Sequence, residues 1–510
     1  MIVESTAGKV RGFEKQGVLQ FRGIPYATAE RFRPAVPVTP WDGVHEATEY
    51  GPIAPQNPSP LESMLGAQSQ ATSEDCLVLN VFTPGVDGAR PVMVWIHGGA
   101  FVAGSGHVPW YNGANLARRG DVVVVTINYR IGALGFLHLG HLDPIFAGSG
   151  ARGIGDQVAA LRWVRDNIAA FGGDAGKVTI FGESAGAMSV GTLLATPAAE
   201  GLFHRAIAQS GAIDHTHQPE VAEWVTDRFL AAAGLGAGSV EGLLDLPVDE
   251  ILRAQSAVET EVQQDHGRAG GPGVGALTFQ PVADGAVVPP APLDAVRSGS
   301  AAGVPLIAGT NADEWNLFHF QARTAGALDE ARLARRLERV VGRDRVGDVL
   351  DVYRSARPGA GPDDLLCALM TDRVFRVPAI RLAEAQLPHA PRVSVYRFDR
   401  GTSAFDGALG ACHAIEIPFV FDNLHRGGVE MFLGGLDEAT HRLARRTAAA
   451  WTTMARTGRP DHEDLAWPAY DLERRETLLL DHTPTVADDP DAEVRAMWDE
   501  LAPVRTPNDS

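Results

Sequence analysis

Residues 181–187 read Phe-Gly-Glu-Ser-Ala-Gly-Ala and place Ser184 between two glycines, directly after the strand-like run Val178–Ile180. This is the G-x-S-x-G pattern of a nucleophile elbow, in which a serine passes from a strand to a helix through a sharp turn. Flanking residues without a side chain fit such a turn, and the N-terminus of the following helix favours negative charge nearby. The stretch therefore predicts that Ser184 is a catalytic nucleophile.

The surrounding sequence supplies the structural context that this motif needs. Residues 177–182 are expected to form a buried strand, and the stretch up to Leu194 a helix. A glycine-rich loop, residues 97–101, reads His-Gly-Gly-Ala-Phe and follows the apolar run Val92–Ile96. Small residues let backbone N–H groups approach a substrate carbonyl and stabilise an oxyanion. A plain tight turn is the alternative, and the serine motif further along the chain favours the catalytic interpretation.

The pattern of apolar runs predicts an α/β fold with a mostly parallel central sheet and helices on both faces. The expected central strands are Val92–Ile96, Val122–Ile127, Val178–Phe181 and Pro305–Ala308. No linker or charge block divides the chain, so residues 1–510 are expected to form a single domain. The extra length is assigned to inserted loops and helices, chiefly Ala212–Leu277 and Ala327–Arg357.

Several blocks of the sequence together resemble the type-B carboxylesterase family, which includes bacterial para-nitrobenzyl-type esterases and the cholinesterases. The blocks are the serine motif, the His-Gly-Gly-Ala-Phe loop and Glu74–Val81, and the resemblance extends from Gly8–Gly12 to Trp467–Tyr470. It implies an α/β-hydrolase fold and hydrolysis of carboxylic esters through an acyl-enzyme, with a small ester as substrate and no cofactor.

The resemblance also implies a serine, glutamate and histidine triad in that chain order. The acid follows the expected strand at residues 304–310, where Glu314 matches the family pattern and its neighbour Asp313 is the main rival. The base matches His413. An imidazole can take the proton of Ser184 and return it, while a carboxylate on the other ring nitrogen fixes the tautomer.

The family further places the oxyanion between the backbone N–H groups of Gly99, Ala100 and Ala185. Glu183 resembles an acid that supports the site from behind the triad. Ser210, which follows the expected strand Arg205–Ala208, is given either the same role or that of a turn residue.

Composition excludes several other classes of function. The net charge of 44 − 63 = −19 disfavours nucleic acid and anionic membranes as partners. Residues 148–153 match G-x-G-x-x-G, but turn formers and no strand precede them, which disfavours a nucleotide-dependent oxidoreductase. Metal-binding motifs of the H-E-x-x-H or paired-cysteine type are absent from the sequence, so no metal is expected.

Three cysteines are too few for a disulfide framework. Cys412, beside the expected base, is either a small packed residue or a site where oxidation modulates activity. The N-terminus lacks the pattern of a signal peptide and no apolar run approaches 18 residues, so the cytoplasm is the expected location. The sequence leaves a monomer and a dimer equally open.

Substrate preference is the most open question at this level. The choline-binding tryptophan of cholinesterases should lie about ten residues before Cys76, where Gly66, Gln68 and Ser69 stand instead, so neutral or aryl esters are expected. A carbamate or amide hydrolase with the same triad is the alternative. A catalytically silent binding protein of the same fold is a further one, disfavoured by the complete triad. The aromatic residues Phe101, Trp110, Phe318 and Phe419 are candidates for the pocket lining, but each is expected in the core rather than in the pocket.

Overall fold

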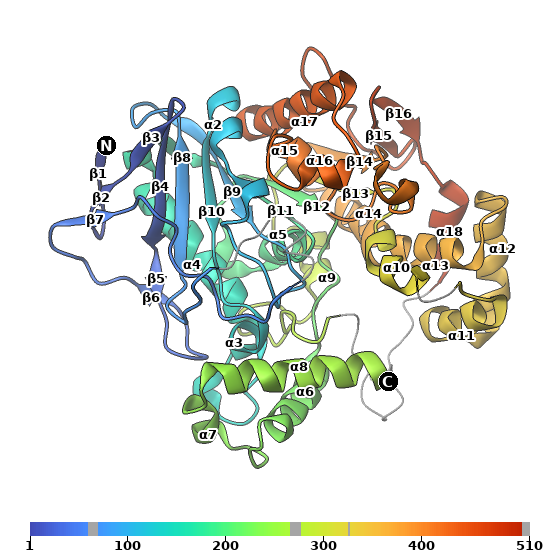
Figure 1. Cartoon of the computed structure of the whole chain (residues 1–510), viewed down its shortest axis with the longest axis horizontal. Coiled ribbons are helices and arrows are strands. Elements are labelled where there is room, and N and C mark those ends of the chain that lie inside the picture. Colours follow the sequence, from blue (N-terminus) through green and yellow to red (C-terminus); the bar gives the residue numbers. More distant parts are fainter. Residues whose placement is uncertain (60–69, 266–276, 325–326, 502–510) are drawn as a thin grey trace.

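A computed structural model describes residues 1–59, 70–265, 277–324 and 327–501 of the chain. Its centre is a large twisted sheet with helices on both faces (Figure 1). In these residues the sheet has 11 strands, which follow one another across it in the order β16 (Thr485–Asp488), β15 (Glu476–Leu480), β14 (Val393–Phe398), β13 (Leu306–Asn311), β12 (Arg205–Gln209), β11 (Gly173–Glu183), β9 (Arg90–Ile96), β10 (Val123–Ile127), β8 (Val78–Thr83), β4 (Val18–Pro25) and β3 (Phe13–Lys15).

The strands from β15 across to β10 run parallel, and only the outer strands β16, β8, β4 and β3 pair antiparallel. The predicted α/β-hydrolase fold with a mostly parallel sheet is therefore confirmed. Because parallel strands end at the same edge of a sheet, the loops after β9, β11 and β13 meet there. These are the loops that carry the predicted oxyanion donors, nucleophile and acid.

Alternation of side chains along the buried strands builds one core on each face of the sheet. In β9, Val94 and Ile96 belong to one hydrophobic cluster, whereas Met93 and Trp95 belong to the other. The first face is covered by α4 (Arg152–Asn167), α5 (Ala185–Ala195), α9 (Pro292–Arg297) and α14 (Val377–Gln386). The second face is covered by α2 (Ala114–Gly120), α15 (Ile417–Val420) and α17 (Glu438–Thr457).

Two groups of helices extend from this sheet (Figure 1). The first falls within the predicted insertion Ala212–Leu277, whereas the second extends well beyond the predicted insertion Ala327–Arg357 on both sides. The first lies below the sheet and comprises α6 (Pro219–Ala232), α7 (Val240–Leu244) and α8 (Val248–Asp265). The other lies at the right, has a buried apolar cluster of its own, and comprises α10 (Trp315–Thr324), α11 (Glu330–Val341), α12 (Val346–Ala356), α13 (Pro362–Thr371), a π-helical turn η7 (Asp372–Arg376) and α18 (Ala492–Glu500).

Shorter elements complete the described chain. They are a small sheet of β1 (Ile2–Ser5), β2 (Gly8–Arg11) and β7 (Val44–Glu46), the pair β5 (Ala27–Thr28) and β6 (Val36–Pro37), the helices α3 (Gly132–Phe136) and α16 (Val429–Leu433), and 3-10 turns at Pro109–Tyr111, Pro144–Phe146, Ser149–Ala151, Ile168–Phe171, Pro197–Ala199, Arg343–Arg345 and Ala404–Gly407.

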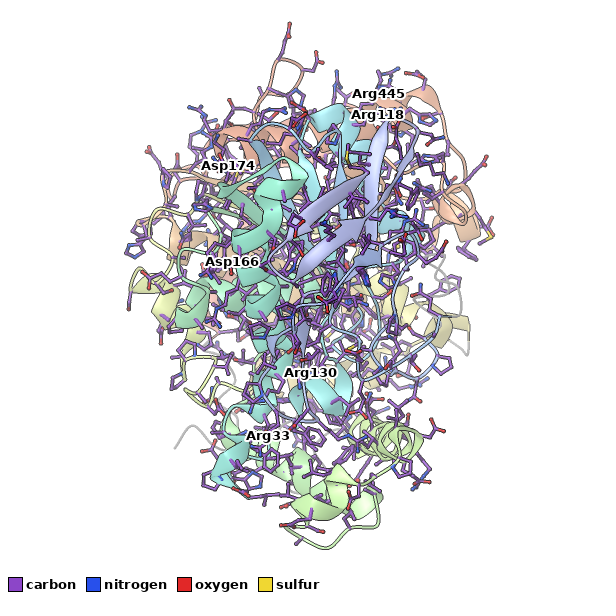
Figure 2. The ribbon with its side chains drawn as sticks, turned by 90° about the vertical axis from the view of Figure 1, so that its left-hand side faces the viewer. Arg33, Arg118, Arg130, Asp166, Asp174 and Arg445 are labelled. Carbon is purple, nitrogen blue, oxygen red and sulfur yellow. The ribbon has the colours of Figure 1, made fainter. Side chains whose placement is uncertain are left out.

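A buried ion pair fixes the turn between β10 and α3. Both carboxylate oxygens of Asp156, on α4, accept hydrogen bonds from the Arg130 guanidinium at 2.7 and 2.8 Å. Arg130 also donates to the backbone carbonyl of Arg33 at 2.8 Å, and Figure 2 shows these two arginines at the lower end of the sheet. Removing one partner of a buried ion pair costs about 3–5 kcal/mol, so the Arg130–Asp156 pair fixes the turn after β10 firmly against α4. Through its bond to the Arg33 carbonyl, Arg130 also links the N-terminal segment to this turn.

The G-x-G-x-x-G segment at residues 148–153 lacks the preceding strand that a dinucleotide-binding motif requires. The residues before it form the 3-10 turn Pro144–Phe146 rather than a strand. A side chain at Gly150 would collide with Val282, so this glycine serves the packing of the segment against a neighbouring loop. The nucleotide-binding interpretation therefore lacks its structural basis.

Candidate active site

Ser184 lies in a strained turn between β11 and α5. Its backbone has φ 56° and ψ −126°, a combination that costs a non-glycine residue about 1–3 kcal/mol. A side chain at Gly182 would come within 2.6 Å of the Ile96 carbonyl oxygen, and one at Gly186 would come closer still. The two glycines are thus required because α5 begins directly against the end of β9. This is the elbow geometry that the motif predicted.

Glu314 and His413 meet in the interior, although 99 residues separate them in the chain. The Nδ1–H of His413 donates to Oε2 of Glu314 at 2.7 Å, and both side chains are fully buried. The other oxygen of Glu314 accepts from the backbone N–H of Asn311 at 2.7 Å. The rival acid Asp313 instead accepts from the N–H of Ala411 at 2.9 Å. Of the two acids, Glu314 is therefore the one that orients the imidazole.

The second ring nitrogen of His413 faces Glu183, the residue before Ser184. Nε2 lies 3.1 Å from Oε1 of Glu183, and among the described hydrogen bonds none joins it to the Ser184 hydroxyl. Catalytic hydrogen bonds of this kind are often long until a substrate is bound. Burial alone would lower the pKa of His413, but the carboxylates of Glu183 and Glu314 outweigh it and raise the pKa to about 9. The imidazole is held between two acids.

The glycine-rich loop lies against the nucleophile. A side chain at Gly98 would come 3.0 Å from the Cβ of Ser184, and Gly99 and Ala100 have φ values of 106° and 55°. In the described part of the chain, the backbone N–H groups of Gly99, Ala100 and Ala185 donate to no protein acceptor. Free N–H groups beside a nucleophile are what an oxyanion requires.

Glu416, Gln209 and Asn311 form a buried polar cluster close to Glu314, which was not predicted from the sequence. Glu416 accepts from the side chain of Asn311 at 2.8 Å and from that of Gln209 at 3.1 Å. Burial, followed by the nearby charge of Glu314, raises the pKa of Glu416. The available signal was a polar residue at the end of each buried strand, Gln209 on β12 and Asn311 on β13. Such residues need partners, and here they share a carboxyl group.

Ser210 stands beside this cluster at the end of β12. Its backbone N–H donates to the Gly309 carbonyl at 2.8 Å, and its φ is 55°. Its buried hydroxyl has no hydrogen-bond partner among the described residues. A side chain at the next residue, Gly211, would collide with the Ser184 carbonyl. Ser210 thus borders the nucleophile without a bond to the triad.

Two phenylalanines from the inserted helices flank the imidazole. The rings of Phe318 on α10 and Phe375 in η7 have centroids 5.1 and 4.8 Å from that of His413. Phe318 is 45% exposed, so the expectation that it belongs to the core was wrong. That expectation is confirmed for Phe101, Trp110 and Phe419, which are fully buried. The exposed ring provides an apolar surface next to the imidazole of His413.

Cys412 is fully buried beside His413. Cys76 and Cys367 are buried as well, and none of the three forms a disulfide. Burial, reinforced by Glu314, raises the pKa of Cys412 well above its usual value. Because the thiolate is the reactive form, this thiol is poorly suited to oxidation, and packing explains it better. Gly66, Gln68 and Ser69 of the choline-site argument lie outside the described residues.

Comparison with known proteins decides the family. The family model described as "Carboxylesterase family" matches residues 1–498. The chain belongs to the carboxylesterase family. It is 40% identical to para-nitrobenzyl esterase of Bacillus subtilis, with 97% of each chain covered, and 37% identical to phenmedipham hydrolase of Pseudarthrobacter oxydans, with 94% of each covered. A solved structure of a carboxylesterase from Geobacillus stearothermophilus superposes with a TM-score of 0.86 at 44% identity, over 98% of this chain and 99% of that one.

Membership of this family makes the protein a serine hydrolase of carboxylic esters. None of the helices in the described part of this carboxylesterase has the length and apolar character of a membrane span. Its elbow, buried acid–histidine pair and glycine-rich loop converge at one edge of the sheet, as an acyl-transfer site demands.

Proposed function

We propose that this carboxylesterase hydrolyses small, uncharged esters, including aryl esters, through an acyl-enzyme on Ser184. The observation that carries the proposal is the buried Glu314–His413 pair, with its 2.7 Å hydrogen bond, at the sheet edge that presents Ser184. His413 takes the proton of the Ser184 hydroxyl as its oxygen attacks the ester carbonyl. The tetrahedral oxyanion accepts hydrogen bonds from Gly99, Ala100 and Ala185.

The intermediate then collapses, and the alcohol leaves with the proton that His413 returns to it. A water molecule enters, gives a proton to His413 and attacks the acyl group, which frees the acid and restores Ser184. Glu314 keeps its hydrogen bond to Nδ1–H and stabilises the imidazolium. The whole cycle uses groups of this chain and water.

The pKa of His413 leads to a pH dependence. A general base must be neutral, so kcat/KM is expected to rise with pH until about 9, the pKa that Glu183 and Glu314 impose. Glu183→Gln removes one of the two carboxylates, lowers this pKa and moves the rising limb to lower pH. Profiles of kcat/KM with an uncharged ester measure the shift. Glu200→Gln, at an exposed site, is the control and should leave the profile in place. An unmoved limb in Glu183→Gln would contradict the assignment.

The substrate class is tested by a panel of p-nitrophenyl esters of increasing acyl length, together with acetylthiocholine, a carbamate and an amide. We expect kcat/KM to peak at short acyl chains, because Phe318 and Phe375 supply an apolar wall beside His413. Choline esters should be at least about tenfold poorer, a difference of about 1.4 kcal/mol in transition-state binding. A preference for acetylthiocholine, for long acyl chains or for the carbamate would replace this substrate class while leaving the triad in place.

A further inference from the structure

A second cluster of chemically active side chains, made of residues outside the triad, lies between the loop after α3 and helix α6. It consists of His138 and His141 from the loop and Glu223 from the helix. One ligand atom of each, a ring nitrogen or a carboxylate oxygen, lies within 4.8 Å of the others. The two imidazole rings stack with centroids 5.4 Å apart and planes 16° apart. Three potential metal ligands from two elements therefore face one another.

His138 is the buried member of this cluster, and its hydrogen bonding is incomplete. Its residue is 5% exposed, and its Nδ1 atom has no hydrogen-bond partner among the described residues. The nearest acid is Asp284, whose Oδ2 lies 3.7 Å from Nδ1, beyond hydrogen-bond range. Leaving a buried polar atom unpaired is unfavourable, so Nδ1 can take a partner that the described residues do not supply.

The electrostatics of the cluster favour a cation there. Two carboxylates, Glu223 and Asp284, are close enough to balance a positive charge. Imidazole nitrogens beside carboxylate oxygens are a characteristic ligand set for divalent transition metals.

We propose that His138, His141 and Glu223 bind a divalent metal ion of the Zn²⁺ type, with Asp284 as a nearby carboxylate. Ligand atoms lie about 2.0–2.2 Å from zinc, which separates neighbouring ligands by about 3.4 Å. The present separations, all within 4.8 Å, exceed this by at most about 1.4 Å. His141 is exposed and Glu223 half-buried, so both can rotate inwards and the ion can enter from solvent. Imidazole ligands favour zinc over Mg²⁺ or Ca²⁺, which prefer oxygen.

Such an ion would join the inserted layer α6–α8 to the body of the fold. The hydroxyl of Thr226, on α6, already donates to the His138 carbonyl at 2.7 Å, so α6 and the loop after α3 are in direct contact. Figure 1 shows α6 and α8 below the sheet, with α3 between them and it. The expected role is structural, since none of the described hydrogen bonds or ion pairs joins these three residues to Ser184, Glu314 or His413. No metal was expected from the sequence, because these three ligands follow no familiar metal-binding spacing.

Calorimetric titration of the untagged, chelator-treated enzyme with ZnCl₂ tests the proposal. One site with a Kd on the order of 1 μM or lower is expected, together with a rise in Tm on saturation. His141→Ala and Glu223→Gln alter exposed or half-buried side chains and should therefore fold, yet each should weaken binding at least about tenfold and reduce the rise in Tm. His425→Ala, at an exposed histidine elsewhere, should bind zinc like the parent.

Other outcomes of the same titration would overturn the proposal. One is the absence of a stoichiometric site in the parent enzyme. Another is equal binding by the parent, His141→Ala and Glu223→Gln, because the heat would then come from scattered surface histidines. Mg²⁺ serves as a second probe and should produce no comparable heat. Tight Mg²⁺ binding that survives His141→Ala would mean an acidic site in place of an imidazole one.

Discussion

Replacing Ser184 by alanine is expected to lower kcat by on the order of 10⁴–10⁶ for any ester that the enzyme hydrolyses. The hydroxyl oxygen forms the covalent bond to the acyl group, and no neighbouring group can take its place. A loss of 10⁴ corresponds to about 5 kcal/mol in the activation free energy. Steady-state kinetics with p-nitrophenyl acetate measure it, and circular dichroism checks that the elbow, with φ 56°, still folds.

Ser210→Ala is the matched control for this substitution. Ser210 is also a buried serine with positive φ at the end of a central strand, and it borders the nucleophile. Its hydroxyl has no described hydrogen-bond partner, so its loss should change kcat by less than about tenfold. If Ser184→Ala kept more than about 1% of the parental kcat, or if Ser210→Ala were the inactive variant, Ser184 would lose its role.

Replacing Glu314 by glutamine is expected to lower kcat by about 10²–10⁴. One oxygen of Glu314 accepts from the backbone of Asn311 and the other from Nδ1–H of His413. A glutamine that keeps the first bond must turn its NH₂ group towards Nδ1, which then accepts. The ring proton moves to Nε2, so His413 can no longer take the serine proton. The same ester assay measures the loss.

Asp313→Asn separates the role of Glu314 from that of its neighbour. The Asp313 carboxylate accepts one bond from the Ala411 N–H, which an asparagine oxygen can also accept, so its kcat should fall by less than about tenfold. Circular dichroism and Tm of both variants show whether the fold persists. A severe loss in Asp313→Asn, combined with a mild one in Glu314→Gln, would exchange the two assignments.

The fold was predictable where local physics and global structure agree. The apolar runs of β9 and β10 are buried on both faces, so any parallel sheet would have drawn them inside. The predicted ends of the strands were less accurate. The strand β11 begins at Gly173 rather than at the expected Lys177, and its register with β9 shifts between Gly173 and Val178. Such an irregularity depends on the neighbouring strand β9 and leaves no periodic trace in the sequence.

The residues of the site also fall into those that the local sequence predicts and those that depend on tertiary contacts. Ser184 follows from its own glycines, which only a tight turn requires, whereas the choice of Glu314 over Asp313 rested on family resemblance. Glu416 was missed because its partners, Gln209 and Asn311, lie on two strands that are far from it in the sequence. The wall of Phe318 and Phe375 comes from inserted helices whose contact with His413 is purely tertiary, so residue type alone placed Phe318 in the core.

The most direct test of the account is covalent labelling of the active enzyme with a fluorophosphonate probe, followed by peptide mass spectrometry. Such a probe reacts with an activated serine and forms the stable counterpart of the acyl-enzyme. We expect one adduct per chain, located on the peptide that contains Ser184, with activity lost in proportion to labelling. Ser184→Ala should take up none. Stoichiometric labelling at another residue, or full labelling with retained activity, would contradict the account.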